Sequence, residues 1–104
     1  MALSSRVGPI PYTKVPEAVG QTRKVVLEVQ KINVEPGGDI FLHPDTDKID
    51  FQVVIPGSFR EFFPKNPEFY YQGKKVRVNG LIEQKGTAYR VVVKNQTQIT
   101  VIKW

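Results

Sequence analysis

The stretch from Gly73 to Lys94 decides the fold. It reads GKKVRVNGLI over Gly73–Ile82 and AYRVVVK over Ala88–Lys94, with Lys85-Gly86 in the connection between the two runs. Valines recur at every second position in both runs, at Val76 and Val78 and at Val91 and Val93, and Val92 is the one valine between them. This is the period-two pattern of strands buried on one face. A short connection that contains glycine favours a hairpin. The stretch therefore predicts two long antiparallel strands with a basic outer face.

Three apolar runs precede this hairpin, at Thr22–Ile32, Asp39–His43 and Phe51–Pro56. A Pro-Gly-Gly turn separates the first two runs, and a polar turn over residues 45–50 separates the last two. Each run alternates its side chains, so each is expected to be a strand with one buried face. The residues Gln98–Lys103 are expected to extend the hairpin or to add a short sixth strand.

An aromatic and proline-rich segment joins the third run to the hairpin. Ser58 stands three residues before Glu61, which is the spacing of a helix capping box, and Pro64 and Pro67 interrupt the helix. We therefore expect a short broken helix here. Its aromatic side chains are expected to plug the open end of a barrel, with one of the two tyrosines exposed. They are Phe59, Phe62, Phe63, Phe69, Tyr70 and Tyr71.

The beginning of the chain has no periodic pattern and contains Gly8, Pro9 and Pro11. Residues 1–13 are expected to form a flexible arm ahead of one folded domain over residues 14–104. No apolar run approaches the roughly 20 residues that span a bilayer, and the first residues lack the apolar middle of a signal peptide. The chain as given is expected to be cytoplasmic, although a signal peptide removed beforehand would leave no trace.

Three strands, a broken helix and a hairpin form the order of the five-stranded Greek-key barrel known as the OB-fold. SH3-like barrels give a similar order, so further motifs are needed. The ones present are Val19-Gly20-Gln21, Ile40-Phe41-Leu42, Phe51-Gln52-Val53-Val54-Ile55, Phe59 to Pro67, Gly73 to Ile82, Lys85-Gly86 and Gln98-Ile99.

With these motifs, residues 15–102 resemble a family of small bacterial OB-fold nucleic-acid-binding domains, similar to the tRNA-anticodon-binding-like OB domains. The chain departs from that pattern at Leu27, where such domains often carry glycine, and after Gly86, where an Arg-Pro-Glu stretch is common. The resemblance implies an all-β barrel of five strands and a nucleic-acid ligand. OB barrels also bind proteins and oligosaccharides, so fold alone does not fix function.

Positive charge is concentrated at one end of the chain. The net charge is +5, and residues 73–104 hold seven lysines or arginines against Glu83 alone. Residues 37–72 hold three basic against six acidic side chains. Such a distribution attracts a polyanion to one end of the molecule. The alternative is a surface that merely keeps the chain in solution, because lysines on exposed strands also block edge aggregation.

A ligand of an OB-fold lies across the second and third strands, between the loops that join strands one and two and strands four and five. Alternation turns Phe41 and His43 outward, where they could stack on bases, and basic side chains of the hairpin could contact phosphates. The candidate residues are Phe41, His43, Gln52, Val54, Lys75, Arg77, Lys85, Tyr89, Arg90 and Lys94. Three alternatives stay open: Phe41 in the core, His43 as an ordinary turn residue, and Tyr89 as a cap on the barrel end.

Catalysis, metals and cofactors are not expected. With one histidine and no cysteine, a nucleophilic triad has little to draw on. Asp45, Asp47 and Asp50 lack the glycine and distal glutamate of a calcium loop and favour a solvated turn. We interpret the chain as a non-catalytic OB-fold module that binds single-stranded DNA or RNA. The alternative is a protein-interaction or assembly module that uses the same barrel surface or the aromatics near Tyr70.

Overall fold

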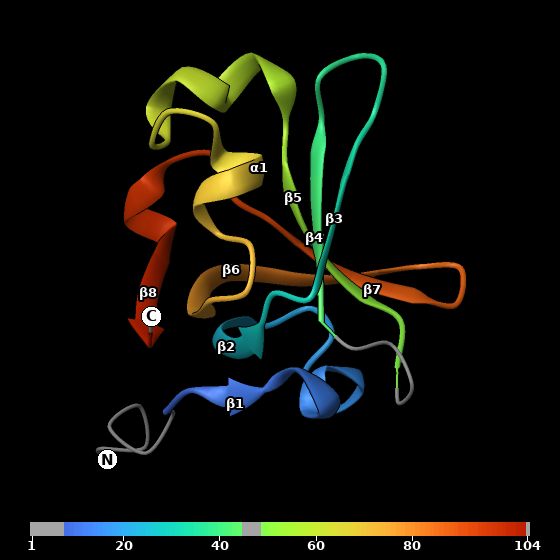
Figure 1. Cartoon of the computed structure of the whole chain (residues 1–104). Helices are drawn as coiled ribbons and strands as arrows, with labels where there is room; N and C mark the ends of the chain where they lie inside the picture. The colour runs from blue at the N-terminus through green and yellow to red at the C-terminus, as the bar shows by residue number, and fades with distance from the viewer. Residues whose placement is uncertain (1–7, 45–48, 104) are drawn as a thin grey trace.

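The computed structural model describes residues 8–44 and 49–103, and Figure 1 shows how they are arranged. The strands in these residues are β1 (Ile10–Pro11), β2 (Thr22–Glu28), β3 (Lys31–Val34), β4 (Ile40–His43), β5 (Phe51–Ile55), β6 (Lys75–Lys85), β7 (Ala88–Val92) and β8 (Ile99–Lys103). The helices are the 3-10 helices η2 (Tyr12–Glu17), η3 (Gly57–Phe62) and η4 (Gln96–Gln98) and the α-helix α1 (Pro67–Tyr70). None of the described helices is long and apolar enough to cross a membrane.

The strands form one mixed sheet in the order β1-β2-β6-β7-β5-β4-β3, with β8 paired to β6. The expected mostly-β architecture is thus confirmed, but the described residues contain eight strands rather than five, and no strand pairing joins the two ends of the sheet. Only Val29 and Gln30 separate β2 from β3, although these strands lie near opposite ends of the order. The sheet must therefore curl back toward its start, as a twisted sheet does.

The residues that the alternation in the sequence predicts to point inward do form the core. The inward side chains of the five expected strands are at most 2% exposed. They are Val25, Leu27, Val29, Ile40, Leu42, Phe51, Val53, Ile55, Val76, Val78, Val91 and Val93. A one-residue slip in any of these strands would have turned its apolar set to the solvent, so the registers were predictable from the sequence.

The strand β6 changes partner along its length, which requires a glycine. It pairs with β2 as far as Leu81 and with β7 from Ile82 onward. A Cβ atom on Gly80 would lie 2.6 Å from Cγ1 of the buried Val91. Glycine is the residue that permits such close approach where a strand bends across a curled sheet.

The connection between β5 and β6 differs in detail from its expectation. The helix η3 is a 3-10 helix whose N-cap residue is Pro56, and no side chain caps it, so the predicted capping box of Ser58 and Glu61 is wrong. The reason is that the amide of Gly57 donates to Oδ1 of Asp39 at 2.8 Å, which fixes the chain one residue before the expected cap. The expected second turn is present as α1, and the chain turns at Gly73 with φ of 77°.

The aromatic plug forms with four of its six expected members, of which Phe59 and Tyr70 are partly buried against the core. Tyr71 is 1% exposed and Phe63 is 7% exposed, and both belong to the core. Phe62 and Phe69 were expected to point inward but are 46% and 74% exposed. Neighbouring residues of a short helical segment face different directions, so one segment cannot bury all of them.

The other side of the core is covered by the N-terminal segment, which Figure 1 shows below the sheet. Ile10 pairs in parallel with Val25, the ring of Tyr12 stacks on Phe51 with centroids 6.3 Å apart, and Val15 is fully buried. Residues 10–13, which were assigned to a flexible arm, therefore contribute to the fold. Residues 1–7 of that arm lie outside the described residues.

The backbone of the loop between β3 and β4 packs closely against Gly57. A Cβ atom there would lie 2.9 Å from the carbonyl carbon of Gly38 and 3.0 Å from the oxygen of Gly37. We expect Gly57→Ala to lower the free energy of unfolding by about 1–3 kcal/mol, because backbone must move to admit the methyl group. Urea denaturation measures this. Gly37→Ala is the matched control, since nothing lies within 4 Å of its added Cβ; equal losses for the two variants would contradict this packing.

Candidate functional site

Four adjacent strands, β3, β4, β5 and β7, present one outer surface. The register sets Asn33 opposite Phe41, Phe41 opposite Val54 and Val54 opposite Val92. Directly opposed residues point to the same side of a sheet, so these side chains form a row. A second row has His43 opposite Lys31 and Arg90 opposite Gln52. We call this surface the β4–β5 face; it comprises Lys31, Asn33, Phe41, His43, Gln52, Val54, Arg90 and Val92.

Phe41 is the aromatic side chain in the middle of this face. Its neighbours Ile40 and Leu42 are fully buried, so the expectation that Phe41 points outward is confirmed, and its side chain is half-buried among the outer rows. Val54 also lies on the outer side, but it is only 6% exposed. Its partners in register, Phe41 and Val92, flank it. Val54 is therefore part of the floor of the face and not a freely accessible contact residue.

A polar hollow of about 380 Å³ opens at one side of the β4–β5 face. It is lined by Lys31, Asn33, His43 and Asp50. Nδ2 of Asn33 lies 3.3 Å from Nε2 of His43, so the amide donates when that ring nitrogen is unprotonated. Asp45 and Asp47, the other members of the acidic turn, lie outside the described residues.

The charge state of His43 follows from its surroundings. Burial lowers the pKa of its imidazole, and the positive charge of Lys31 lowers it further, while Asp50 and a backbone hydrogen bond with Phe51 act in the opposite direction. The ring is therefore neutral at neutral pH. A neutral imidazole can stack on a base or hydrogen-bond to its edge, but it adds no charge for a phosphate.

The histidine gives the fold a measurable pH dependence. Because the pKa of His43 is lowered in the folded state, the unfolded chain binds the proton more readily. Its contribution to stability is present above the usual histidine pKa of about 6.5 and is lost as the pH falls through the lowered value. We expect His43→Gln to lose less stability than the wild type between about pH 7 and pH 5 in urea denaturation. Parallel pH curves for the two proteins would contradict this.

A second hollow, of about 450 Å³, lies at the other side of the face, over β6 and β7. Its lining residues are Leu81, Glu83, Arg90, Val92, Lys94 and Gln98. Nε of Arg90 donates to Oε1 of Glu83 at 3.3 Å, and Nζ of Lys94 lies 5.4 Å from the ring centroid of Phe59. Arg90 is thus held in place on the face and Lys94 at its border, and both can still meet an anion because they are partly exposed.

The remaining sequence candidates lie elsewhere. Arg77 is opposite Val26 of β2 and Thr100 of β8, and Lys75 precedes it on the same half of β6. Lys85 lies at the tip of the β6–β7 hairpin. Tyr89 is opposite the buried Phe51 and packs against the core. The structure therefore brings together Phe41, His43, Gln52, Val54, Arg90 and Lys94, and it separates Lys75, Arg77, Lys85 and Tyr89 from them.

Three residues of the face, Lys31, Asn33 and Val92, were not among the sequence candidates, and the first two lie on a strand that runs further than the sequence predicted. The first expected strand ended at Ile32, which left no reason to place its continuation beside β4. The alternation in KINV over Lys31–Val34 was a usable signal, because it carries the strand pattern two residues further.

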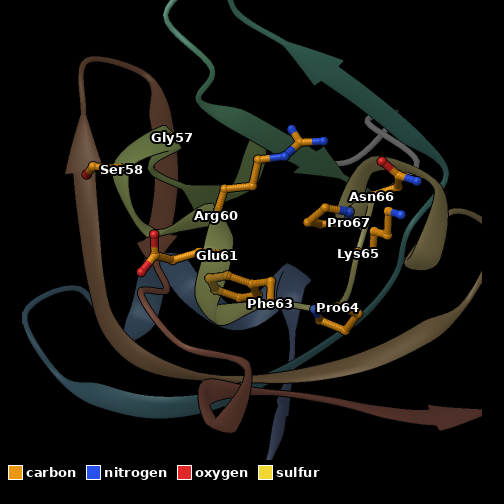
Figure 2. A pocket seen from close by; sticks show the side chains of 9 residues that line it. All are labelled: Gly57, Ser58, Arg60, Glu61, Phe63, Pro64, Lys65, Asn66 and Pro67. Atoms are coloured by element: carbon orange, nitrogen blue, oxygen red, sulfur yellow. The ribbon is translucent and has the colours of Figure 1, made fainter.

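A third hollow, of about 530 Å³, lies on the connection between β5 and α1 (Figure 2). Figure 2 shows Arg60 and Glu61 pointing in different directions from η3, with the ring of Phe63 below them in this view. Nη2 of Arg60 donates to both carboxylate oxygens of Glu68, at 2.7 and 2.8 Å, and this bond lowers the pKa of Glu68. The lining contains none of the residues of the β4–β5 face.

Comparison with known proteins defines the fold. No protein-family model and no curated protein matches the sequence. Among solved structures, an aspartyl-tRNA synthetase from Entamoeba histolytica is similar with a TM-score of 0.64 at 14% identity, over 99% of this chain and 23% of that one. The chain thus spans about a quarter of the length of the synthetase. The second OB-fold domain of replication protein A from Methanococcus maripaludis is similar with a TM-score of 0.50 at 18% identity, over 91% of this chain and 97% of that one. Together with the strand order, these likenesses show that the chain has an OB-type fold.

Proposed function

We propose that this chain is a non-catalytic OB-fold module that binds single-stranded nucleic acid, DNA or RNA, across the β4–β5 face. We further propose that β2 and β3 act as one bent strand, which makes a five-stranded Greek-key barrel with β4, β5, β6 and β7 and relates the chain to small bacterial OB-fold nucleic-acid-binding domains. The observation that carries the proposal is the register, because it puts Phe41 at the centre of an outer face with cations at both sides.

Each part of the face has a role in this proposal. Phe41 stacks on a base, which every base permits because each has an aromatic face. His43 and Gln52 offer hydrogen bonds to base edges, and Arg90 and Lys94 neutralise phosphates. Lys85 is the last residue of β6, next to the turn of the hairpin that borders the ligand in OB-folds, and it lies apart from the face. The names of the similar structures, a tRNA synthetase and a domain of replication protein A, agree with a nucleic-acid ligand.

Fluorescence anisotropy of a labelled oligonucleotide of about 15 residues, as DNA and as RNA, tests this function. We expect a dissociation constant in the micromolar range or below. The logarithm of the association constant should fall linearly with the logarithm of the salt concentration, with a slope of about −0.7 for each phosphate contact. The sugar that binds more tightly identifies the preferred nucleic acid. Absence of binding at low salt for both oligonucleotides would overturn the proposal.

One observation favours a second candidate, a docking site for a protein partner. Phe69 is 74% exposed and Phe62 is 46% exposed, and both lie on the connection that carries the third hollow. Apolar docking is nearly insensitive to ionic strength. A partner bound in this way would stay bound at high salt and would be lost with Phe69→Ser. A nucleic acid on the β4–β5 face would dissociate at high salt and would still bind the Phe69→Ser variant.

A further inference from the structure

The strand β6 carries a line of outward side chains that leads away from the β4–β5 face. Its inward residues Val76, Val78 and Ile82 are fully buried. The residues between them point outward, and the burial pattern of the strand alternates accordingly. We call this line, with its neighbours in register, the β6 track. It comprises Lys75, Arg77, Asn79 and Leu81 of β6, Thr22, Lys24, Val26 and Glu28 of β2, and Thr100 and Lys103 of β8.

The cations of the β6 track lack counterions. Lys24, Lys75, Arg77 and Lys103 form no ion pair with any described residue, whereas Arg60 and Arg90 do. The one acidic side chain in these rows is Glu28, opposite Lys75, and it accepts a hydrogen bond from the side chain of Gln30. The track is therefore a surface with four positive charges and one negative charge.

The two lysines at its end face each other. Lys75 of β6 is paired with Lys103 of β8, across a shift of the register between Lys75 and Val76, and like charges on paired residues destabilise a sheet. Protection of an exposed edge explains a lysine on β8, which pairs only with β6. It does not explain Lys75 and Arg77, because β6 has β2 on one side and β8 on the other. An anionic ligand bound over the track would offset the repulsion between the positive charges of Lys75 and Lys103.

The β6 track is continuous with the proposed binding face. Glu83 of β6 is opposite Arg90 of the β4–β5 face, and Arg77 follows six residues back along the same strand. At about 3.3 Å per residue this is a distance of about 20 Å. Between the two ends lies the second hollow, with Leu81 (46% exposed) on its lining. A strand that leaves the face beside Arg90 meets an apolar side chain and then the unpaired cations.

We propose that the β6 track binds the sugar–phosphate backbone of the nucleic acid where it continues beyond the β4–β5 face. This inference rests on the proposed function and enlarges its site. Arg77 and Lys75 contact successive phosphates, and Asn79 and Thr100 beside them can donate hydrogen bonds to phosphate oxygens. The module thereby holds a longer stretch of strand than the β4–β5 face alone covers, without reading its sequence.

The test compares two oligonucleotides, of about 6 and about 15 residues, by anisotropy. The variant Lys75→Gln/Arg77→Gln removes two charges from the track, and Lys14→Gln/Lys65→Gln removes two charges from η2 and the η3–α1 connection. Neither control residue lies on the face or the track. We expect the track variant to bind the long oligonucleotide about tenfold more weakly than the wild type does. The slope of the logarithm of affinity against the logarithm of salt concentration should become shallower by about 1.4, which corresponds to the loss of two phosphate contacts. Its affinity for the short oligonucleotide should equal that of the control.

The outcomes separate the two proposals. If the long oligonucleotide binds the track variant as tightly as it binds the control, the track is not part of the site, even though the β4–β5 face binds the short one. If neither oligonucleotide binds the wild type at low salt, the proposed function fails and the track falls with it. Both substitution pairs lie at the surface, and circular dichroism confirms that the variants are folded.

Discussion

Phe41→Ala is expected to weaken binding of a single-stranded oligonucleotide by about tenfold to a hundredfold. The reason is that stacking of one base on an aromatic ring contributes about 1–3 kcal/mol, and Phe41 is the aromatic ring in the centre of the β4–β5 face. Anisotropy titration at one fixed salt concentration measures the loss. The salt slope should change little, because the substitution removes no charge.

Two variants make this result specific. Phe69→Ala removes a ring that is 74% exposed and is not among the residues of the β4–β5 face, and it should leave the affinity within about twofold of the wild type. Phe41→Tyr keeps an aromatic surface and should bind nearly as tightly as the wild type. Equal losses for Phe41→Ala and Phe69→Ala would remove Phe41 from the site, as would unchanged affinity of a folded Phe41→Ala variant.

Tyr71→Ala is expected to lower the free energy of unfolding by about 3–5 kcal/mol, which is the usual cost of deleting a buried aromatic ring. Tyr71 is 1% exposed and meets Tyr70 edge to face, with ring centroids 4.9 Å apart. Burial raises the pKa of its phenol well above the usual value. The phenol is therefore neutral in the folded chain at all but strongly alkaline pH.

Urea denaturation measures this loss, and Phe69→Ala again serves as the control, two residues away in the same segment. An exposed side chain should change stability by no more than about 0.5 kcal/mol. Similar losses for the two variants would mean that the connection does not plug the core in the way described. A loss below about 1 kcal/mol for Tyr71→Ala would contradict its burial.

The sequence predicts the core of this protein well because its strands are rich in valine. In β2, β5 and the hairpin, one face of each strand is apolar at every second position. The other face is mostly polar and carries only single valines such as Val26, Val54 and Val92, so the uniformly apolar face is the one expected in the core. The shortest strand could not be predicted, because it is too short to show this alternation. β1 has two residues, one of them proline, and no periodicity can be read from two residues.

The helical connection was harder to predict because its local signal competes with a distant contact. Ser58 and Glu61 have the spacing of a capping box, yet the hydrogen bond from Gly57 to Asp39 fixes the start of η3. That bond joins residues 18 positions apart, and a short sequence window cannot contain it.

The candidate site was predicted in part. The outward orientation of Phe41 followed from its buried neighbours in β4, whereas the location of Arg77 depends on where β6 exchanges β2 for β7. This exchange occurs between Leu81 and Ile82, and it is a property of the whole sheet. The hairpin therefore looked like one basic face in the sequence, but its cations lie on two surfaces in the structure.

The central claim is that single-stranded nucleic acid binds the β4–β5 face. Titration of the ¹⁵N-labelled chain with a single-stranded oligonucleotide, followed by amide chemical shifts, tests it most directly. We expect the largest changes at Phe41, His43, Gln52 and Arg90, with no change at Phe62 and Phe69. Changes confined to the segment from Phe62 to Phe69, or none at a saturating oligonucleotide concentration, would contradict the claim.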